Sequence, residues 1–213
     1  MTATGCRLYV ITPEHLDLES FPDELARALD AGDVAAVQLR LKTADDGAWK
    51  RATDVLLPVC RSRGAALLLN DRADLVVAAG GDGAHVGQTD MPVRDARQAM
   101  GAGLTLGVTC KSSLDLARRA IEDGADYVAF GAFFPSTSKP VTTLADPEVL
   151  RRWSAESAAP SCAIGGITAV NLAPLVRSGA HLLAIIGGVW SHPEGPAAGV
   201  RAINAAIKSA AQA

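Results

Sequence analysis

Eight short apolar segments alternate with helical patterns along the chain, and this alternation is the feature that most constrains its fold. Most of the segments are almost continuously apolar, as expected of parallel strands that are buried on both faces. We expect strands over residues 7–12, 36–40, 66–70, 83–87, 105–109, 127–131, 161–165 and 182–186. Helical patterns cover residues 22–32, 44–64, 75–80, 93–100, 114–124, 147–153, 170–179 and 197–211. Eight such βα units predict a (β/α)8 TIM barrel, a fold that usually needs about 200–250 residues.

The chain has 213 residues and no linker or low-complexity segment, so we expect residues 1–213 to form a single barrel domain. An open doubly wound sheet is the alternative fold. It is less favoured because no G-x-G-x-x-G motif follows the first expected strand.

Composition excludes several classes of function. The net charge is −3 and no basic stripe is present, so nucleic acid is not an expected partner. No apolar run is long enough to span a bilayer, and no secretory signal is recognisable. The four cysteines are scattered without a C-x-x-C pair, which is typical of buried thiols in a reducing cytoplasm. We therefore expect a cytoplasmic protein whose partners are small molecules; the oligomeric state, a homo-oligomer included, stays open.

In a (β/α)8 barrel, functional groups gather where strands end and βα loops begin. Three cations lie at such points: Arg40 and Lys42 after the second strand, and Lys139 after the sixth. They would repel one another unless an anion lay among them, and a diphosphate is the natural candidate. Alternatively, Lys42 and Lys139 are solvated loop lysines. Arg40 still needs a partner, because it ends a buried strand.

The loop after the sixth strand reads Pro135-Ser136-Thr137-Ser138-Lys139. Its hydroxyl groups can donate hydrogen bonds to phosphate, and Lys139 adds a compact positive charge. The same composition is also common in ordinary loops.

Two carboxylates, Asp71 and Asp90, follow neighbouring strands. One or two carboxylates together with phosphate oxygens are the usual ligands of Mg²⁺. The alternative is that each aspartate caps the helix that follows it.

Paired glycines, Gly165-Gly166 and Gly187-Gly188, follow the seventh and eighth strands, where barrels of this class often bind phosphate. Tight turns are the alternative explanation. No nucleophilic triad is recognisable, and His85 is expected to be packed inside the barrel. The departure of a diphosphate, assisted by cations and a metal ion, fits these residues best.

Taken together, the motifs resemble those of the thiamine-phosphate synthase family. They are Gln38-x-Arg40-x-Lys42, Asn70-Asp71-Arg72, His85-Val86-Gly87-Gln88-x-Asp90, Gly107-Val108-Thr109, the Pro135-Ser136-x-Ser138-Lys139 loop and Ile164-Gly165-Gly166-Ile167. The resemblance implies a barrel enzyme that joins hydroxymethylpyrimidine diphosphate to hydroxyethylthiazole phosphate, with Mg²⁺ as cofactor. It further implies that diphosphate leaves first and that the thiazole nitrogen attacks the resulting carbocation.

The resemblance also assigns roles residue by residue. It implies that Gln38, Arg40, Lys42 and Asn70 contact the pyrimidine diphosphate, that Asp71 and Asp90 bind Mg²⁺, that Thr109 lies near the diphosphate, that Ser136, Ser138 and Lys139 reach both substrates, and that Gly166, Ile186 and Gly187 line the thiazole-phosphate pocket. Arg40, Lys42 and Lys139 are the expected catalytic residues.

This chain departs from the family pattern at Gly187, where a serine is usual. A thiazole tautomerase with the same fold is one rival function, disfavoured because no histidine follows the sixth strand. A non-catalytic phosphate-binding barrel is another, disfavoured because the cations and carboxylates are all present.

Overall fold

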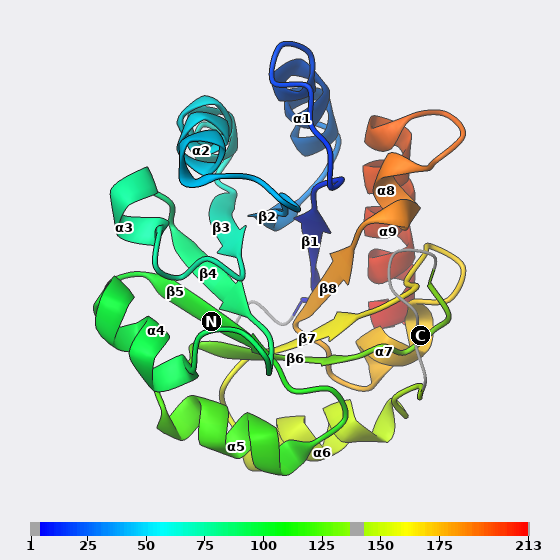
Figure 1. Cartoon of the computed structure of the whole chain (residues 1–213). Helices are drawn as coiled ribbons and strands as arrows, with labels where there is room; N and C mark the ends of the chain where they lie inside the picture. Colours follow the sequence, from blue (N-terminus) through cyan, green and yellow to red (C-terminus); the bar gives the residue numbers. More distant parts are fainter. Residues whose placement is uncertain (1–4, 137–142, 213) are drawn as a thin grey trace.

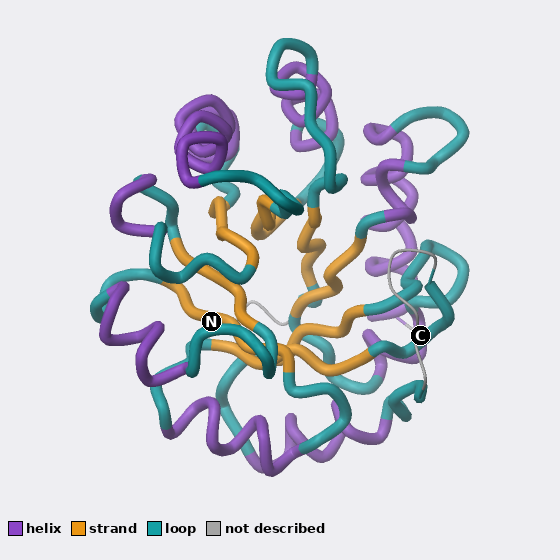
Figure 2. The backbone as a smooth tube through the Cα atoms, viewed as in Figure 1, coloured by secondary structure: helices purple, strands orange, loops and turns teal. Residues whose placement is uncertain are grey.

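Eight parallel strands form a closed barrel in the order β1 to β8, surrounded by helices (Figures 1 and 2). The computed structural model describes residues 5–136 and 143–212. The strands are β1 (Arg7–Ile11), β2 (Val34–Leu39), β3 (Ala66–Asn70), β4 (Gly83–Val86), β5 (Thr105–Thr109), β6 (Tyr127–Gly131), β7 (Ser161–Ile164) and β8 (Leu182–Ile185). The prediction of a (β/α)8 barrel is confirmed.

Helices follow the strands and cover the outside of the barrel. They are α1 (Phe21–Leu29), α2 (Asp46–Arg61), α3 (Val76–Ala79), α4 (Val93–Met100), α5 (Leu114–Glu122), α6 (Glu148–Glu156), α7 (Ala173–Arg177), α8 (Gly187–Trp190) and α9 (Pro196–Gln212). Each longer helix buries one face. In α2 the buried side chains recur every three or four residues, as at Trp49, Ala52, Leu56 and Cys60.

The predicted strands agree with the structure to within two residues, whereas helix ends differ by up to three: α1 and α2 end three residues earlier than predicted, and α6 ends three residues later. The helix expected over 170–179 begins only at Ala173, because Asn171 Oδ1 accepts from Thr168 N at 2.8 Å and holds the preceding turn. The segment after β8, expected to be a glycine loop, forms the short helix α8. Trp190 fixes α8 to the barrel by donating from Nε1 to Ile11 O at 2.7 Å.

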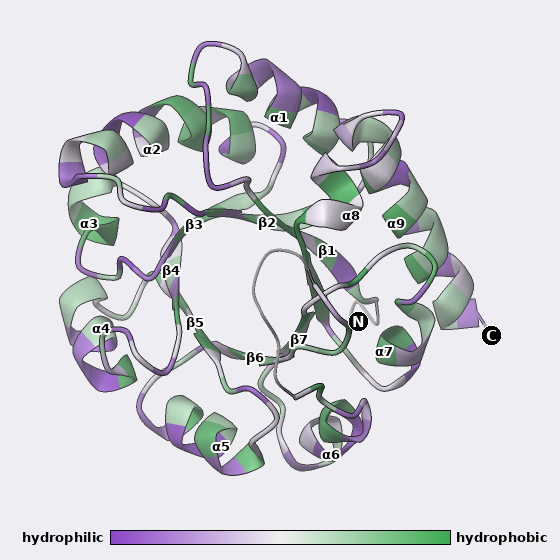
Figure 3. Cartoon of the chain, turned by 45° about the vertical axis from the view of Figure 1, so that its right-hand side comes forward, coloured by the Kyte–Doolittle hydropathy of each residue, from purple (hydrophilic) through white to green (hydrophobic). Residues whose placement is uncertain are grey.

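The apolar core has two parts. Figure 3 shows the ring of strands that separates them, inside the ring of helices. The larger part lies between strands and helices. The smaller part fills the barrel and includes Tyr9, Leu68, Tyr127 and Cys162. The alternation of side chains along each strand separates the two parts.

The four cysteines carry free thiols. Cys60, Cys110 and Cys162 are buried as expected, whereas Cys6 is only partly buried. No helix within the described residues is long and apolar enough to cross a membrane.

Aspartates at the amino-terminal end of the barrel hold neighbouring strands together. Asp82 Oδ2 accepts from Leu67 N at 2.8 Å, and Asp126 Oδ2 accepts from Leu106 N at 2.7 Å. Arg97 also donates to Asp126, at 2.6 Å. These carboxylates lie at the end that serves stability in such barrels, and the opposite end is left for a site.

Candidate active site

The predicted site residues of the described chain gather at the carboxyl-terminal rim of the barrel. They end a strand or follow it in the next loop: Gln38, Arg40 and Lys42 at β2; Asn70 and Asp71 at β3; Asp90 after β4; Thr109 at β5; Ser136 after β6; Gly166 after β7; and Ile186 and Gly187 after β8. Ser138 and Lys139 lie outside the described residues. Because all eight strands are parallel and the barrel is closed, these residues share one mouth.

Arg40 and Lys42 share one carboxylate, Glu14, which comes from the loop after β1. Arg40 Nη1 lies 2.5 Å and Lys42 Nζ 2.9 Å from Glu14 Oε1. The side chain of Arg40 is only 12% exposed, whereas that of Lys42 is 53% exposed. The backbone N–H of Arg40 also donates to Thr12 Oγ1 at 3.0 Å. Arg40 is therefore held firmly in the rim, and Lys42 extends toward solvent.

Glu14 was not predicted as a site residue. The hydrogen bonds from Lys42 and Arg40 hold its pKa below the ordinary value, so it is ionised at neutral pH. The partner that Arg40 needs is thus supplied by the chain itself. The trio keeps one net positive charge, which an incoming anion can use. The sequence signal that could have revealed Glu14 is its place just after the first strand.

Asp71 and Asp90 come from neighbouring strands, since Asn70 of β3 lies opposite His85 of β4. Asn70 Nδ2 donates to Asp71 Oδ2 at 2.7 Å. Asp90 Oδ2 accepts from the backbone N–H of Gly87 at 2.7 Å, so this carboxylate closes its own loop. The residue that caps helix α4 is Pro92, not Asp90. The contacts of Asp90 therefore do not favour its alternative role as a helix cap.

The donor set fits Mg²⁺. No group of three or more His, Cys, Asp or Glu within the described ranges could hold a metal ion. Mg²⁺ does not need such a cage, because it usually keeps several waters and binds one or two carboxylates together with substrate phosphates. Asp71 and Asp90 are two carboxylates that follow neighbouring strands, which is the kind of pair such a site needs.

Backbone strain is concentrated at the same rim. Over residues 5–136 and 143–212, three non-glycine residues have positive φ: Thr43 at 56°, Asp71 at 63° and Lys111 at 53°. They follow β2, β3 and β5. Such conformations cost about 1–3 kcal/mol each and cluster at functional sites. Their placement agrees with a site at this end of the barrel.

Gln38 and Thr109 point into a buried polar cluster inside the barrel. Gln38 Nε2 donates to Tyr9 Oη at 2.9 Å, and Thr109 Oγ1 lies 2.8 Å from His85 Nε2. His85 is packed inside the barrel, as expected. Burial lowers its pKa to about 4, an effect that the nearby charge of Asp90 only partly opposes. His85 is therefore neutral at pH 7.

A pH dependence of stability follows from the lowered pKa of His85. Between about pH 6.5 and 4 the unfolded chain binds a proton that the folded chain does not. The free energy of unfolding therefore decreases as the pH is lowered through this range, by at most about 1.4 kcal/mol per pH unit. Urea unfolding at pH 7 and pH 5 measures this loss. His85→Gln should lessen the difference by about 2 kcal/mol, whereas His15→Gln, in the exposed loop after β1, should not. An unchanged difference in His85→Gln would contradict the assignment.

The paired glycines after β7 have a packing role. A Cβ at Gly165 would lie 2.3 Å from the Ala132 side chain, and one at Gly166 would lie 2.3 Å from Pro135 O. Both glycines have positive φ. They let the segment after β6 pass close by, where Phe134 N donates to Gly165 O at 3.1 Å. Close packing against the segment after β6 is therefore one reason for glycine at both positions.

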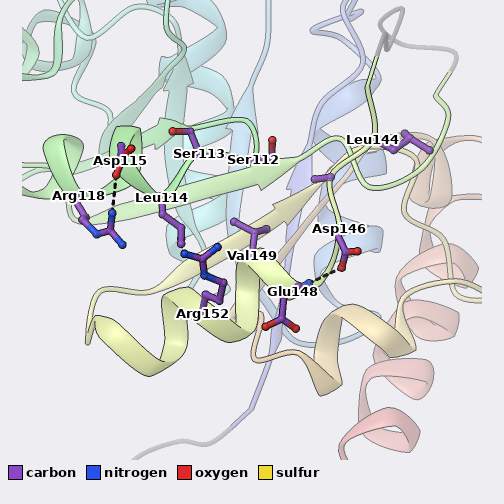
Figure 4. Close-up of a pocket in the computed structure, with 11 residues that line it drawn as sticks. Ser112, Ser113, Leu114, Asp115, Arg118, Leu144, Asp146, Glu148, Val149 and Arg152 are labelled. Carbon is purple, nitrogen blue, oxygen red and sulfur yellow. Dashed lines mark hydrogen bonds and ion pairs between the residues drawn. The ribbon is translucent and has the colours of Figure 1, made fainter.

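A cavity of about 580 Å³ lies beside the rim, between the loop before α5 and the start of α6 (Figure 4). It is lined by acidic and basic side chains, among them Asp115, Arg118, Glu148 and Arg152. In Figure 4, Arg118 pairs with Asp115. None of the described site residues lines this cavity, so it does not extend the predicted site.

Three comparisons with known proteins point to one family. The sequence model of the family described as thiamine monophosphate synthase matches residues 8–189. Thiamine-phosphate synthase from Rhodospirillum centenum is 54% identical over 205 residues, which covers 96% of this chain and 99% of the relative. That from Hyphomonas neptunium is 47% identical, over 96% of this chain and 95% of the relative. The structure of thiamine phosphate pyrophosphorylase from Pyrococcus furiosus superposes with a TM-score of 0.83 at 27% identity, over 96% of both chains.

Proposed function

Because the chain belongs to the thiamine monophosphate synthase family, it is a transferase, and we propose that it joins hydroxymethylpyrimidine diphosphate to hydroxyethylthiazole phosphate. The products are thiamine phosphate and diphosphate. The observation that carries the proposal is a cation pair and a carboxylate pair at the ends of three adjacent strands. Arg40 and Lys42 follow β2, while Asp71 and Asp90 follow β3 and β4.

In this proposal the reaction begins when the bond from the pyrimidine methylene carbon to the diphosphate oxygen breaks. Both electrons leave with the oxygen, and the thiazole nitrogen then uses its lone pair to form the new C–N bond. Arg40 stabilises the charge that develops on the leaving oxygens, because its side chain is only 12% exposed, Glu14 holds its guanidinium and Thr12 holds its backbone N–H. Lys42 reaches the same anion from the solvent side.

Asp71 and Asp90 are the residues that would hold Mg²⁺, and Asn70 orients Asp71 through its 2.7 Å hydrogen bond. The ion would add positive charge beside the leaving diphosphate. Gln38 lies deeper, at the floor of the mouth, where it suits the pyrimidine ring. Thr109 lies near the diphosphate, and Ser136, Ser138 and Lys139 complete the site from the loop after β6.

The thiazole phosphate is assigned to the loops after β7 and β8, with Gly166, Ile186 and Gly187 at its pocket. Ile186 is half-buried against the apolar interior of the barrel, and Gly187 is exposed. Ile186 thus offers an apolar contact for the thiazole ring, and Gly187 offers exposed backbone for the phosphate, which supports this assignment.

The test is an assay with purified protein, both substrates and Mg²⁺, in which thiamine phosphate is followed by fluorescence after oxidation. Product should appear only when all three components are present, with one diphosphate released per thiamine phosphate. Replacement of the thiazole phosphate by the unphosphorylated thiazole should raise KM strongly. Absence of product from folded protein with all three components would refute the proposed function.

Gly187 offers a prediction of its own. A Cβ there meets nothing within 4 Å and the backbone φ is not positive, so Gly187→Ser fits without strain. An added hydroxyl bond to a charged phosphate is worth about 1.5 kcal/mol, so KM for thiazole phosphate should fall about tenfold. Gly188→Ser is the matched control, because its Cβ would lie 2.9 Å from Ile167 O and should lower stability instead. If KM in Gly187→Ser stays unchanged, the phosphate lies elsewhere.

A further inference from the structure

Five side chains from five strands form one chain of hydrogen bonds across the inside of the barrel. Gln38 donates to Tyr9 at 2.9 Å, and the hydroxyls of Tyr9 and Tyr127 lie 3.1 Å apart. His85 Nδ1 lies 2.8 Å from Tyr127 Oη, and His85 Nε2 lies 2.8 Å from Thr109 Oγ1. Gln38 and Thr109 are site residues, whereas the three residues between them have had no role so far.

Four of the five members of this chain of hydrogen bonds are shut off from water, and Thr109 is partly exposed at the rim. Tyr9, Gln38, Tyr127 and His85 are each at most 5% exposed. Their neighbours inside the barrel are apolar, among them Ile11, Leu68 and Ala129 in the same cluster as the two tyrosines. A buried polar group without a partner costs about 1–3 kcal/mol, so the four buried side chains hold one another in place.

Gly107 makes room for this arrangement. It lies opposite Tyr127 in the sheet, and a Cβ there would lie 2.0 Å from Tyr127 Cζ. Its φ is not positive, so the backbone itself does not require glycine. The tyrosine rings also meet edge to face, with centroids 6.2 Å apart. The position of the Tyr127 ring is therefore fixed by packing as well as by hydrogen bonds.

The imidazole couples the two ends. A neutral histidine has one donor and one acceptor nitrogen, so the direction of its hydrogen bond to Thr109 depends on the direction of its bond to Tyr127. The same dependence passes through Tyr127 to Tyr9, which receives the amide of Gln38. A change in the hydrogen bonds of Gln38 therefore alters the hydrogen bonding available to Thr109, and the reverse also holds.

We propose that Tyr9, Tyr127 and His85 are positioning residues that fix Gln38 and Thr109 and couple the pyrimidine end of the site to the diphosphate end. The proposal rests on the proposed function. None of the three touches substrate in it; each acts through the two site residues at the rim.

Tyr127→Phe is the central test, because it keeps the ring and removes the hydroxyl that joins Tyr9 to His85. We expect kcat to fall about 10- to 100-fold, with KM for thiazole phosphate unchanged. Tyr9→Phe should instead act mainly on KM for the pyrimidine diphosphate, because it takes the acceptor from Gln38 and from Tyr127 but leaves the contact between Tyr127 and His85 in place. The double variant should be no slower than Tyr127→Phe, since residues that act as one unit are not additive.

Thr53→Val is the matched control. Thr53 is fully buried in α2 and donates from its hydroxyl to Trp49 O at 2.8 Å, so its loss should lower Tm and leave kcat unchanged. Kinetics are measured well below the Tm of each variant. The positioning role is overturned if folded Tyr127→Phe has kcat and both KM values within twofold of wild type. If Tyr127→Phe does not fold, the same criterion applies to folded Tyr9→Phe. Inactive wild-type protein would instead overturn the proposed function, so the two failures are distinguishable.

Discussion

Arg40→Ala should lower kcat by about 100- to 1,000-fold, because it removes a largely buried positive charge at the mouth of the barrel. Arg40 is held by Glu14 and by Thr12, so little reorganisation is needed when charge develops on the leaving diphosphate. Steady-state rates at saturating substrates and Mg²⁺ measure the effect. Arg40→Lys should recover only part of the rate, since lysine keeps the charge but not the paired N–H donors of a guanidinium.

Arg94→Ala provides the control for Arg40→Ala. Arg94 also pairs with a carboxylate, Asp123 at 2.6 Å, but it is 79% exposed on the outer helices. Such pairs contribute about 0–1 kcal/mol to stability, and the rate should not change. A rate for Arg40→Ala within tenfold of wild type would remove Arg40 from the catalytic step.

Removal of Mg²⁺ should abolish turnover, and Asp90→Asn should raise the Mg²⁺ concentration needed for half-maximal rate by at least about tenfold. Asparagine keeps an oxygen that can accept from Gly87 N, so the loop after β4 should retain its hydrogen bond. The loss is then one of charge alone. Rates are measured over a Mg²⁺ titration and again in excess chelator.

Asp123→Asn is the corresponding control. Its carboxylate pairs with Arg94 away from the described site residues, and the Mg²⁺ dependence should stay that of wild type. Full turnover in excess chelator would contradict the assignment of Asp71 and Asp90 to a metal ion.

The barrel could be predicted because its strands are apolar runs with helical patterns between them. The ends of β3, β5 and β6 fall where the sequence predicts them. Arg40, Asp71 and Asp90 could be assigned to one site for the same reason, since the ends of parallel strands meet at one rim. Helix α8 was not predicted, because Gly187 and Gly188 favour loops and contacts with distant residues, such as those of Trp190 with Ile11 and Phe21, help to hold the turn in place.

Interactions between distant strands could not be predicted. Glu14 lies 26 residues from Arg40, and the hydroxyls of Tyr9 and Tyr127 belong to residues 118 apart. In the sequence the two tyrosines are simply aromatic residues of apolar strands. The need for glycine at position 107 likewise becomes clear only from the structure, in which the ring of Tyr127 leaves no room for a side chain there. Strand periodicity predicts which side chains face inward, but the register and tilt of the closed barrel decide which of them touch.

A crystal structure of the protein with thiamine phosphate, diphosphate and Mn²⁺ in place of Mg²⁺ tests the account most directly. The anomalous signal of Mn²⁺ should lie within ligand distance of Asp71 and Asp90, with diphosphate oxygens bound to the metal and to Arg40. A metal ion bound away from both carboxylates, or a diphosphate outside the mouth of the barrel, would contradict it.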